Sequence, residues 1–168
     1  MKRVLWLGVV ITLLVGNVVG FRLYSAEKAR TQLLLVEQAQ QVHANLHVAS
    51  IHIQKITTPD APEAQFWIQL TARNLAEAET GLHQLTGHLL DRDSGSMRTM
   101  ARHIQRIYSR LQSMAWSKDY TGLPEVREAV EMLAGHLDGH LNMDDRKTYL
   151  AQFRDLINRY ESPYPGLR

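Results

Sequence analysis

Apolar residues recur at alternating steps of four and three along most of this chain. The first such seam is made of Leu35, Ala39, Val42, Leu46, Ala49, Ile53 and Ile56. These steps place side chains on one face of an α-helix, as in a coiled coil. No segment alternates with period two, so no strand is expected. The seam therefore predicts an all-α protein.

Three further seams follow the first. They are Ile68, Thr71, Leu75, Ala78, Leu82, Leu85 and Leu89; then Met97, Met100, Ile104, Ile107, Leu111 and Met114; then Val126, Val130, Leu133, Leu137 and His140. Asp60 and Glu63 have the spacing of a capping box before the second helix. Residues 91–95 read as a turn, and Pro124 suits the first position of the fourth helix.

The spacing of apolar residues that defines the fourth seam does not continue after residue 140. Asn142 with Asp145 resembles a new helix cap, and a new seam contains Leu150, Phe153, Ile157 and Tyr160. Either the fourth helix is kinked or a short fifth helix begins near Met143. Short connections between helices of similar length predict an antiparallel four-helix bundle, or a four-plus-one bundle, over residues 24–160. Residues 161–168 form a short tail.

An uncharged apolar run precedes the bundle. Val4–Phe21 is 18 residues long, close to the length that a transmembrane helix needs. A cleaved signal peptide is the alternative. Because Arg22 and the residues after it continue into helix-forming sequence, a retained anchor over residues 1–23 is preferred. No breaker separates the anchor from the first seam, so one helix is expected to continue through both.

The short N-terminal tail indicates the orientation of this anchor. It favours an inner N-terminus, hence a single-pass protein of the cell inner membrane with its soluble domain in the periplasm. Gly16 and Gly20 form a small-xxx-small pair of the kind that lets two membrane helices approach. A homodimer through this segment is therefore one alternative, and a chance glycine pair is the other.

Composition excludes several classes of site. The 168 residues include no cysteine, which removes disulfides, thiolate metal sites and cysteine nucleophiles. The net charge of +2 gives no reason to expect nucleic-acid binding. Nucleotide-binding and hydrolase motifs are absent. The carboxylates Asp138, Asp144 and Asp145 cluster at a helix junction, where capping explains them, so no catalytic residue and no enzyme activity are predicted.

Histidine is the one metal-ligating residue in useful number, with eight in the chain. His43/His47 and His136/His140 have i,i+4 spacing, which puts both imidazoles of a pair on one helical face. If residue 57 lies level with residue 124 on an antiparallel neighbour, residue 43 lies level with about residue 138. The two pairs then share one height and could bind a divalent metal. Boundary histidines without a ligand are the alternative, and bis-histidine haem binding is a further one.

A basic stripe is the second candidate site. Residues 92–118 carry six Lys or Arg against the single acid Asp93, and four of these recur every four residues: Arg98, Arg102, Arg106 and Arg110. They could bind an acidic partner, a phosphate-bearing ligand or lipid headgroups. In the alternative they face acids of the neighbouring helices, namely Glu77, Glu79, Glu125, Glu128 and Glu131.

The sequence therefore supports three functional hypotheses. The preferred one is a non-enzymatic, membrane-anchored bundle that acts as an interaction, accessory or assembly subunit with another membrane or periplasmic protein. The second is a metal-binding or metal-sensing module that uses the paired histidines. The third is a small-ligand or anion sensor that uses the arginine stripe at a dimer interface.

Overall fold

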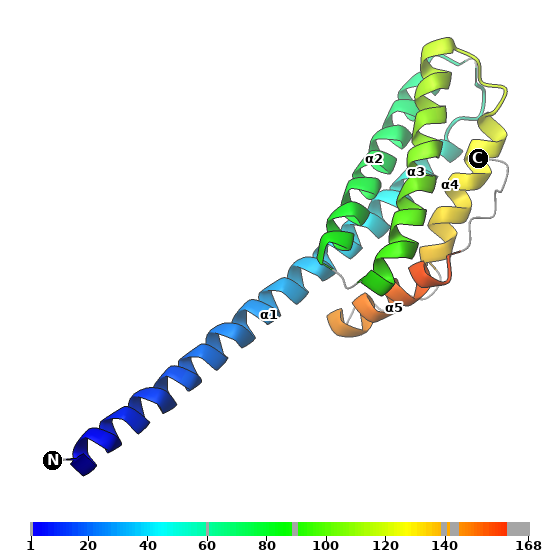
Figure 1. Ribbon diagram of the computed structural model, residues 1–168. Helices are drawn as coiled ribbons and strands as arrows, with labels where there is room; N and C mark the ends of the chain where they lie inside the picture. The colour runs from blue at the N-terminus through cyan, green and yellow to red at the C-terminus, as the bar shows by residue number, and fades with distance from the viewer. Residues whose placement is uncertain (1, 60, 89–90, 139–140, 142–144, 161–168) are drawn as a thin grey trace. The chain divides into compact units, whose positions relative to one another are not determined.

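The computed structural model describes residues 2–59, 61–88, 91–138, 141 and 145–160. For residues 2–14, 91–94 and 146–147 it describes the backbone alone. Within these residues five α-helices follow one another: α1 (Lys2–Gln54), α2 (Ala64–His88), α3 (Asp91–Ser117), α4 (Leu123–Asp138) and α5 (Arg146–Asn158). The chain divides into two compact units, Met1–Leu34 and Leu35–Arg168. In the second unit the helices pack as a bundle (Figure 1), which confirms the all-α bundle prediction.

The seams form the core of this bundle. In the first four helices every seam residue that the structure describes is buried. The face of each helix that the sequence assigns to the core is therefore the face that packs against the other helices. Burial of that apolar face, rather than helix propensity, supplies most of the stability of such helices.

Hydrogen bonds fix the direction of neighbouring helices. Gln38 of α1 bonds Gln84 of α2, and His52 bonds Asn74 further along, so α1 and α2 are antiparallel. His43 meets Asp138 of α4. At the other end of the same pair, the Arg127 guanidinium donates to the Ile56 carbonyl. The register predicted for residues 43 and 138 is therefore confirmed.

Two details of the helix boundaries differ from the sequence prediction. Residues 91–95 are not a turn: α3 already begins at Asp91. The prediction was wrong because Asp, Ser and Gly favour the start of a helix as well as a turn. Asp60 and Asn142 lie outside the described residues. Asp145 directly precedes α5 and caps it, since its carbonyl accepts the Tyr149 N–H and its carboxylate accepts a hydrogen bond from the Thr148 hydroxyl.

The last helix settles the question of a kink or a fifth helix. α5 is separate from α4, and its core face is Tyr149, Phe153 and Ile157. The sequence assigned Leu150 rather than Tyr149 to this seam. Leu150 is only partly buried, because Tyr149 takes the inward position one residue earlier.

Among the residues whose side chains the structure describes, no helix is long and apolar enough to span a membrane. Residues 4–14 of the expected anchor Val4–Phe21 lie outside that set.

Candidate functional site

A group of titratable side chains from α1, α4 and α5 lies together among the described residues. His43 Nε2 is 2.8 Å from Asp138 Oδ1, and His47 Nδ1 is 3.1 Å from Asp138 Oδ2. One carboxylate thus accepts hydrogen bonds from two imidazoles one helical turn apart. The i,i+4 spacing puts the rings on one face of α1, and the antiparallel register brings the end of α4 level with them.

Tyr149 adds a third partner from α5. Its hydroxyl lies 3.4 Å from His43 Nδ1 and 3.5 Å from the Ala39 carbonyl. Burial raises the pKa of Tyr149 to about 12, so this hydroxyl is protonated throughout the neutral range. His43 therefore lies between a neutral phenol on one ring nitrogen and a carboxylate on the other.

Asp138 is charged at neutral pH. Partial burial alone would raise the pKa of its carboxyl, but the hydrogen bonds from His43 and His47, together with their charges, outweigh that effect. The pKa of Asp138 consequently lies below its ordinary value of 3.8. The group His43, His47, Asp138 and Tyr149, named here the junction cluster, is a polar link between three helices.

His136, one member of the other predicted histidine pair, does not join this cluster. His136 Nε2 donates to the Leu156 carbonyl at 2.7 Å, and its ring packs edge-on against Tyr160. It therefore belongs to the contact between α4 and α5. His140 lies outside the described residues. Over the part of the chain that is described, no group of three or more His, Asp or Glu side chains is arranged to hold a metal ion, and the four-histidine site stays a prediction.

A second polar group joins α3 to the end of the described chain. His103 is only 4% exposed, and its Nδ1 bonds the Tyr160 hydroxyl. Burial and then the positive charge of Arg106 lower the pKa of His103, so the imidazole is neutral at pH 7. Burial also raises the pKa of Tyr160. Neutral hydrogen-bonding groups here tie residue 160 to α3.

The arginine stripe is exposed on α3, and acids cover only part of it. Arg98, Arg102 and Arg106 have solvent-exposed side chains. Arg110 forms an ion pair with Glu125 at 3.2 Å, as the alternative reading predicted. The two acids of α2 that were expected to face the stripe form ion pairs within α2 instead. Glu77 pairs with Arg73, and Glu79 pairs with His83.

Arg102 and Arg106 thus form the open part of the stripe. The Arg102 Nε–H donates to the carbonyl of Arg98. With the residues that the structure describes, neither Arg102 nor Arg106 forms an ion pair. Arg102 and Arg106 are referred to below as the arginine face.

The sequence did not indicate that Asp138, Tyr149 and Arg127 would form polar contacts between helices. Asp138 was explained as a cap, although the predicted register already put it level with His43.

Comparison with known proteins adds no further guide, because no family model, curated protein or solved structure matches this chain.

Proposed function

We propose that this chain is a non-enzymatic, membrane-anchored bundle that acts as an interaction or accessory subunit of a membrane complex. The observation that carries the proposal is the arginine face of α3. Arg102 and Arg106 are exposed and one turn apart, whereas Arg110 is already paired with Glu125. Adjacent guanidinium groups favour a carboxylate-rich partner, because each can donate two parallel N–H hydrogen bonds to one carboxylate.

The anchor is part of the same proposal. The run Val4–Phe21 has no charge and suits a single membrane crossing. We infer an inner-membrane protein whose bundle lies on the periplasmic side. Carbonate extraction should leave the protein in the membrane fraction, and protease added to spheroplasts should digest the bundle. Release by carbonate would contradict the anchor, and protection from protease would contradict the orientation.

Crosslinking in the native membrane tests the partner directly. A photoreactive amino acid replaces Gln105, which is exposed between Arg102 and Arg106. We expect one discrete adduct whose yield falls as salt rises, since exposed charge pairs are screened. The adduct should disappear when Arg102→Gln and Arg106→Gln are combined.

The control has to remove the same charge elsewhere. Lys118→Gln combined with Arg159→Gln also removes two positive charges from exposed positions, but on other parts of the bundle. The adduct should persist in this control. Equal loss in both variants, or no adduct at all, would contradict the proposed role of the arginine face.

Metal binding by the paired histidines is a second candidate, and it requires the junction cluster to rearrange, since His43 and His47 are hydrogen-bonded to Asp138 and not arranged around a metal position. Both hydrogen bonds would have to be replaced by metal–ligand bonds, with release of protons. Titration of the full chain in detergent with zinc, copper, nickel or cobalt tests this. Binding should be lost in His43→Ala with His47→Ala and kept in His83→Ala with His88→Ala; unchanged binding in the first variant would retire this candidate.

A further inference from the structure

Trp116, in the last turn of α3, has a side chain that is 92% exposed. Folded proteins bury most of the surface of a tryptophan on average. Trp67 of α2 shows that usual outcome, because its ring is partly buried and packs against the rings of His52 and Phe66. α3 continues to Ser117, so regular helix geometry fixes the side of α3 on which Trp116 lies.

Trp116 lies on the same side of α3 as the arginine face. It follows Arg102 by 14 residues and Arg106 by ten. Fourteen residues make about 3.9 helical turns, so Trp116 and Arg102 differ in direction by only about 40°, and Trp116 and Arg106 by about 80°. The helix rises about 1.5 Å per residue, which puts the indole roughly 15 Å from Arg106 and 21 Å from Arg102 along the axis.

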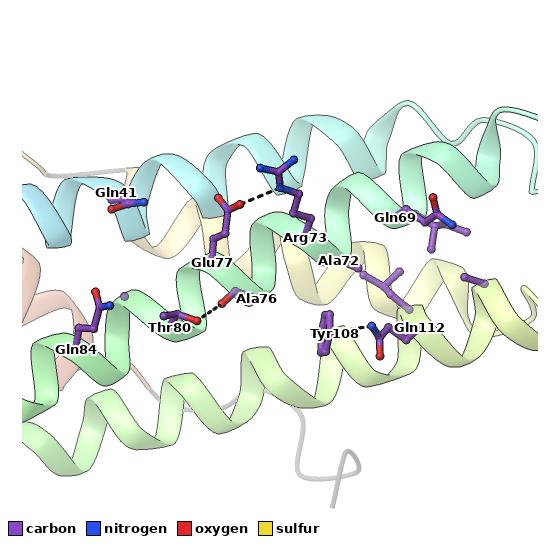
Figure 2. Close-up of a pocket in the computed structure, with 14 residues that line it drawn as sticks. Gln41, Gln69, Ala72, Arg73, Ala76, Glu77, Thr80, Gln84, Tyr108 and Gln112 are labelled. Carbon is purple, nitrogen blue, oxygen red and sulfur yellow. Dashed lines mark hydrogen bonds and ion pairs between the residues drawn. The ribbon is translucent and has the colours of Figure 1, made fainter.

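Neutral polar side chains fill this outward side of α3 between the cations and the ring. Gln105 and Ser113 are exposed there, and residues 94–118 contain no acid. Gln112 and Tyr108 belong to the neighbouring side, where the Gln112 amide donates to the Tyr108 hydroxyl and both line a groove beside α2 (Figure 2). The outward side therefore offers two cations, hydrogen-bonding groups and one aromatic ring, and it has no charge that would repel a carboxylate.

We propose that Trp116 is the apolar anchor of the surface through which the arginine face binds its partner. This inference rests on the proposed function and defines the partner further. That partner is a protein with clustered carboxylates and, roughly 15–21 Å away, an apolar pocket that accepts an indole ring. Tryptophan and arginine are enriched among the residues that carry most of the binding energy of protein interfaces. Burial of the ring supplies affinity, whereas the charges supply mainly association rate and specificity.

A lipid surface is the other class of partner that tryptophan and arginine side chains bind. A helix that lies on a bilayer inserts an apolar face along its length. Among the side chains of α3 that the structure describes, Trp116 is the one large apolar group that is exposed, and it lies at one end. A protein partner therefore fits this side of α3 better, and a lipid partner is an outcome of the test.

A second photoreactive position tests how far the surface extends. Ser113 is exposed close to Trp116, and Gln54 is exposed on α1. In the full chain in its native membrane, a photoreactive amino acid at Ser113 should trap the same protein as one at Gln105, judged by the mass of the adduct. The same probe at Gln54 should not trap it.

The outcomes distinguish this inference from the proposed function. An adduct from Gln105 with none from Ser113 would overturn the anchor and leave the proposed function standing. An adduct from neither position would overturn both. An added mass equal to that of one lipid molecule would overturn the protein partner.

Substitution of the ring separates its contribution from that of the charges. With the probe at Gln105, Trp116→Ala should lower the adduct yield about tenfold or more, as expected for an anchor residue. The salt dependence of the remaining adduct should be unchanged, because both arginines are still present. Arg102→Gln alone should instead reduce the salt dependence, since it removes a screened charge.

Two further variants control for shape and for loss of fold. Ile51→Ala also shortens an exposed apolar side chain, on α1, and should leave the adduct yield unchanged. Trp116→Phe keeps an aromatic ring and should retain more adduct than Trp116→Ala. Circular dichroism melting of the full chain in detergent should be the same for all of them, because both positions are exposed. Equal adduct yields from the natural protein, Trp116→Ala and Ile51→Ala would overturn the anchor role of Trp116.

Discussion

A Cβ atom added to Gly81 of α2 would lie 2.6 Å from Cγ2 of Val42 on α1. That distance is shorter than van der Waals contact. Val42 is buried, and a β-branched side chain in a helix has one strongly preferred rotamer. Glycine is otherwise unfavourable inside a helix, so its presence at position 81 is explained by the close approach of α1 and α2.

Gly81→Ala should therefore destabilise the bundle. Overpacking of this kind costs about 1–3 kcal/mol, which exceeds the gain in helix propensity of about 1 kcal/mol. Urea denaturation followed by circular dichroism measures the change. Gly135→Ala is the matched control: no atom lies within 4 Å of its added Cβ, so that variant should be slightly stabilised.

Shortening the opposing side chain tests the cause. If the clash with Val42 is responsible, Gly81→Ala should cost much less in a Val42→Ala background than in the natural protein. Additive effects of the two substitutions would show that they act independently, and the close-approach explanation would then be wrong.

The junction cluster should make stability depend on Asp138. Asp138→Ala removes both carboxylate hydrogen bonds, and we expect a loss of about 1 kcal/mol at pH 7, because the carboxylate is partly exposed and screened. Since the pKa of Asp138 is lowered in the fold, its contribution is present above the ordinary value of 3.8 and is lost as pH falls through the lowered pKa.

The pH profile separates this role from a general packing role. Urea denaturation of the natural protein and of Asp138→Asn is compared from pH 7 to pH 3. The difference in free energy of unfolding should shrink as the pH falls below 3.8. A difference that stays constant over the whole range would mean that the charge of Asp138 does not stabilise the fold.

His103 should give the bundle a second acid sensitivity, at higher pH. Its pKa is lowered from 6.5 in the fold, so between that lowered pKa and 6.5 the unfolded chain binds more protons. Stability should therefore fall as pH drops below 6.5. Glutamine cannot take up a proton. His103→Gln should therefore lose less free energy of unfolding between pH 7.5 and 5.5 than the natural protein does.

The measurement for His103 is the slope of the free energy of unfolding against pH. The free energy at a single pH is not sufficient, because the substitution also changes the hydrogen bond to Tyr160. His52 is the control, since its pKa is lowered as well, by burial and then by Lys55, yet its side chain is less enclosed. His52→Gln should reduce the slope less. Equal slopes in the natural protein and His103→Gln would refute the argument.

Periodicity predicted the core well because it is a local property of the sequence. Leu46, Ile104 and Leu133, each from a different predicted seam, are all buried. The register between α1 and α4 followed from one assumption, that residue 57 lies level with residue 124 on an antiparallel neighbour, and the His43–Asp138 contact agrees with it.

The candidate site was harder to predict because it depends on contacts between helices. His43 and His47 share a face of α1 by spacing alone, but only the packed bundle shows that Asp138 joins them. His136 has the same spacing to His140, yet bonds the Leu156 carbonyl. Spacing assigns side chains to one face of a helix, whereas the partner of that face depends on the rest of the fold.

Lys118, just after α3, provides a test of backbone strain. Its φ is 57°, in the left-handed region where a Cβ costs roughly 1–2 kcal/mol. Its N–H still bonds the Met114 carbonyl at 2.9 Å, as in a helix C-cap that glycine usually occupies. Lys118→Gly should stabilise the bundle by about 1 kcal/mol in urea denaturation, after the greater freedom of glycine in the unfolded chain is subtracted. Lys118→Ala removes the same charge and keeps the Cβ, so it should leave stability nearly unchanged. If both variants shifted stability equally, the loss of charge and not the relief of strain would be the cause.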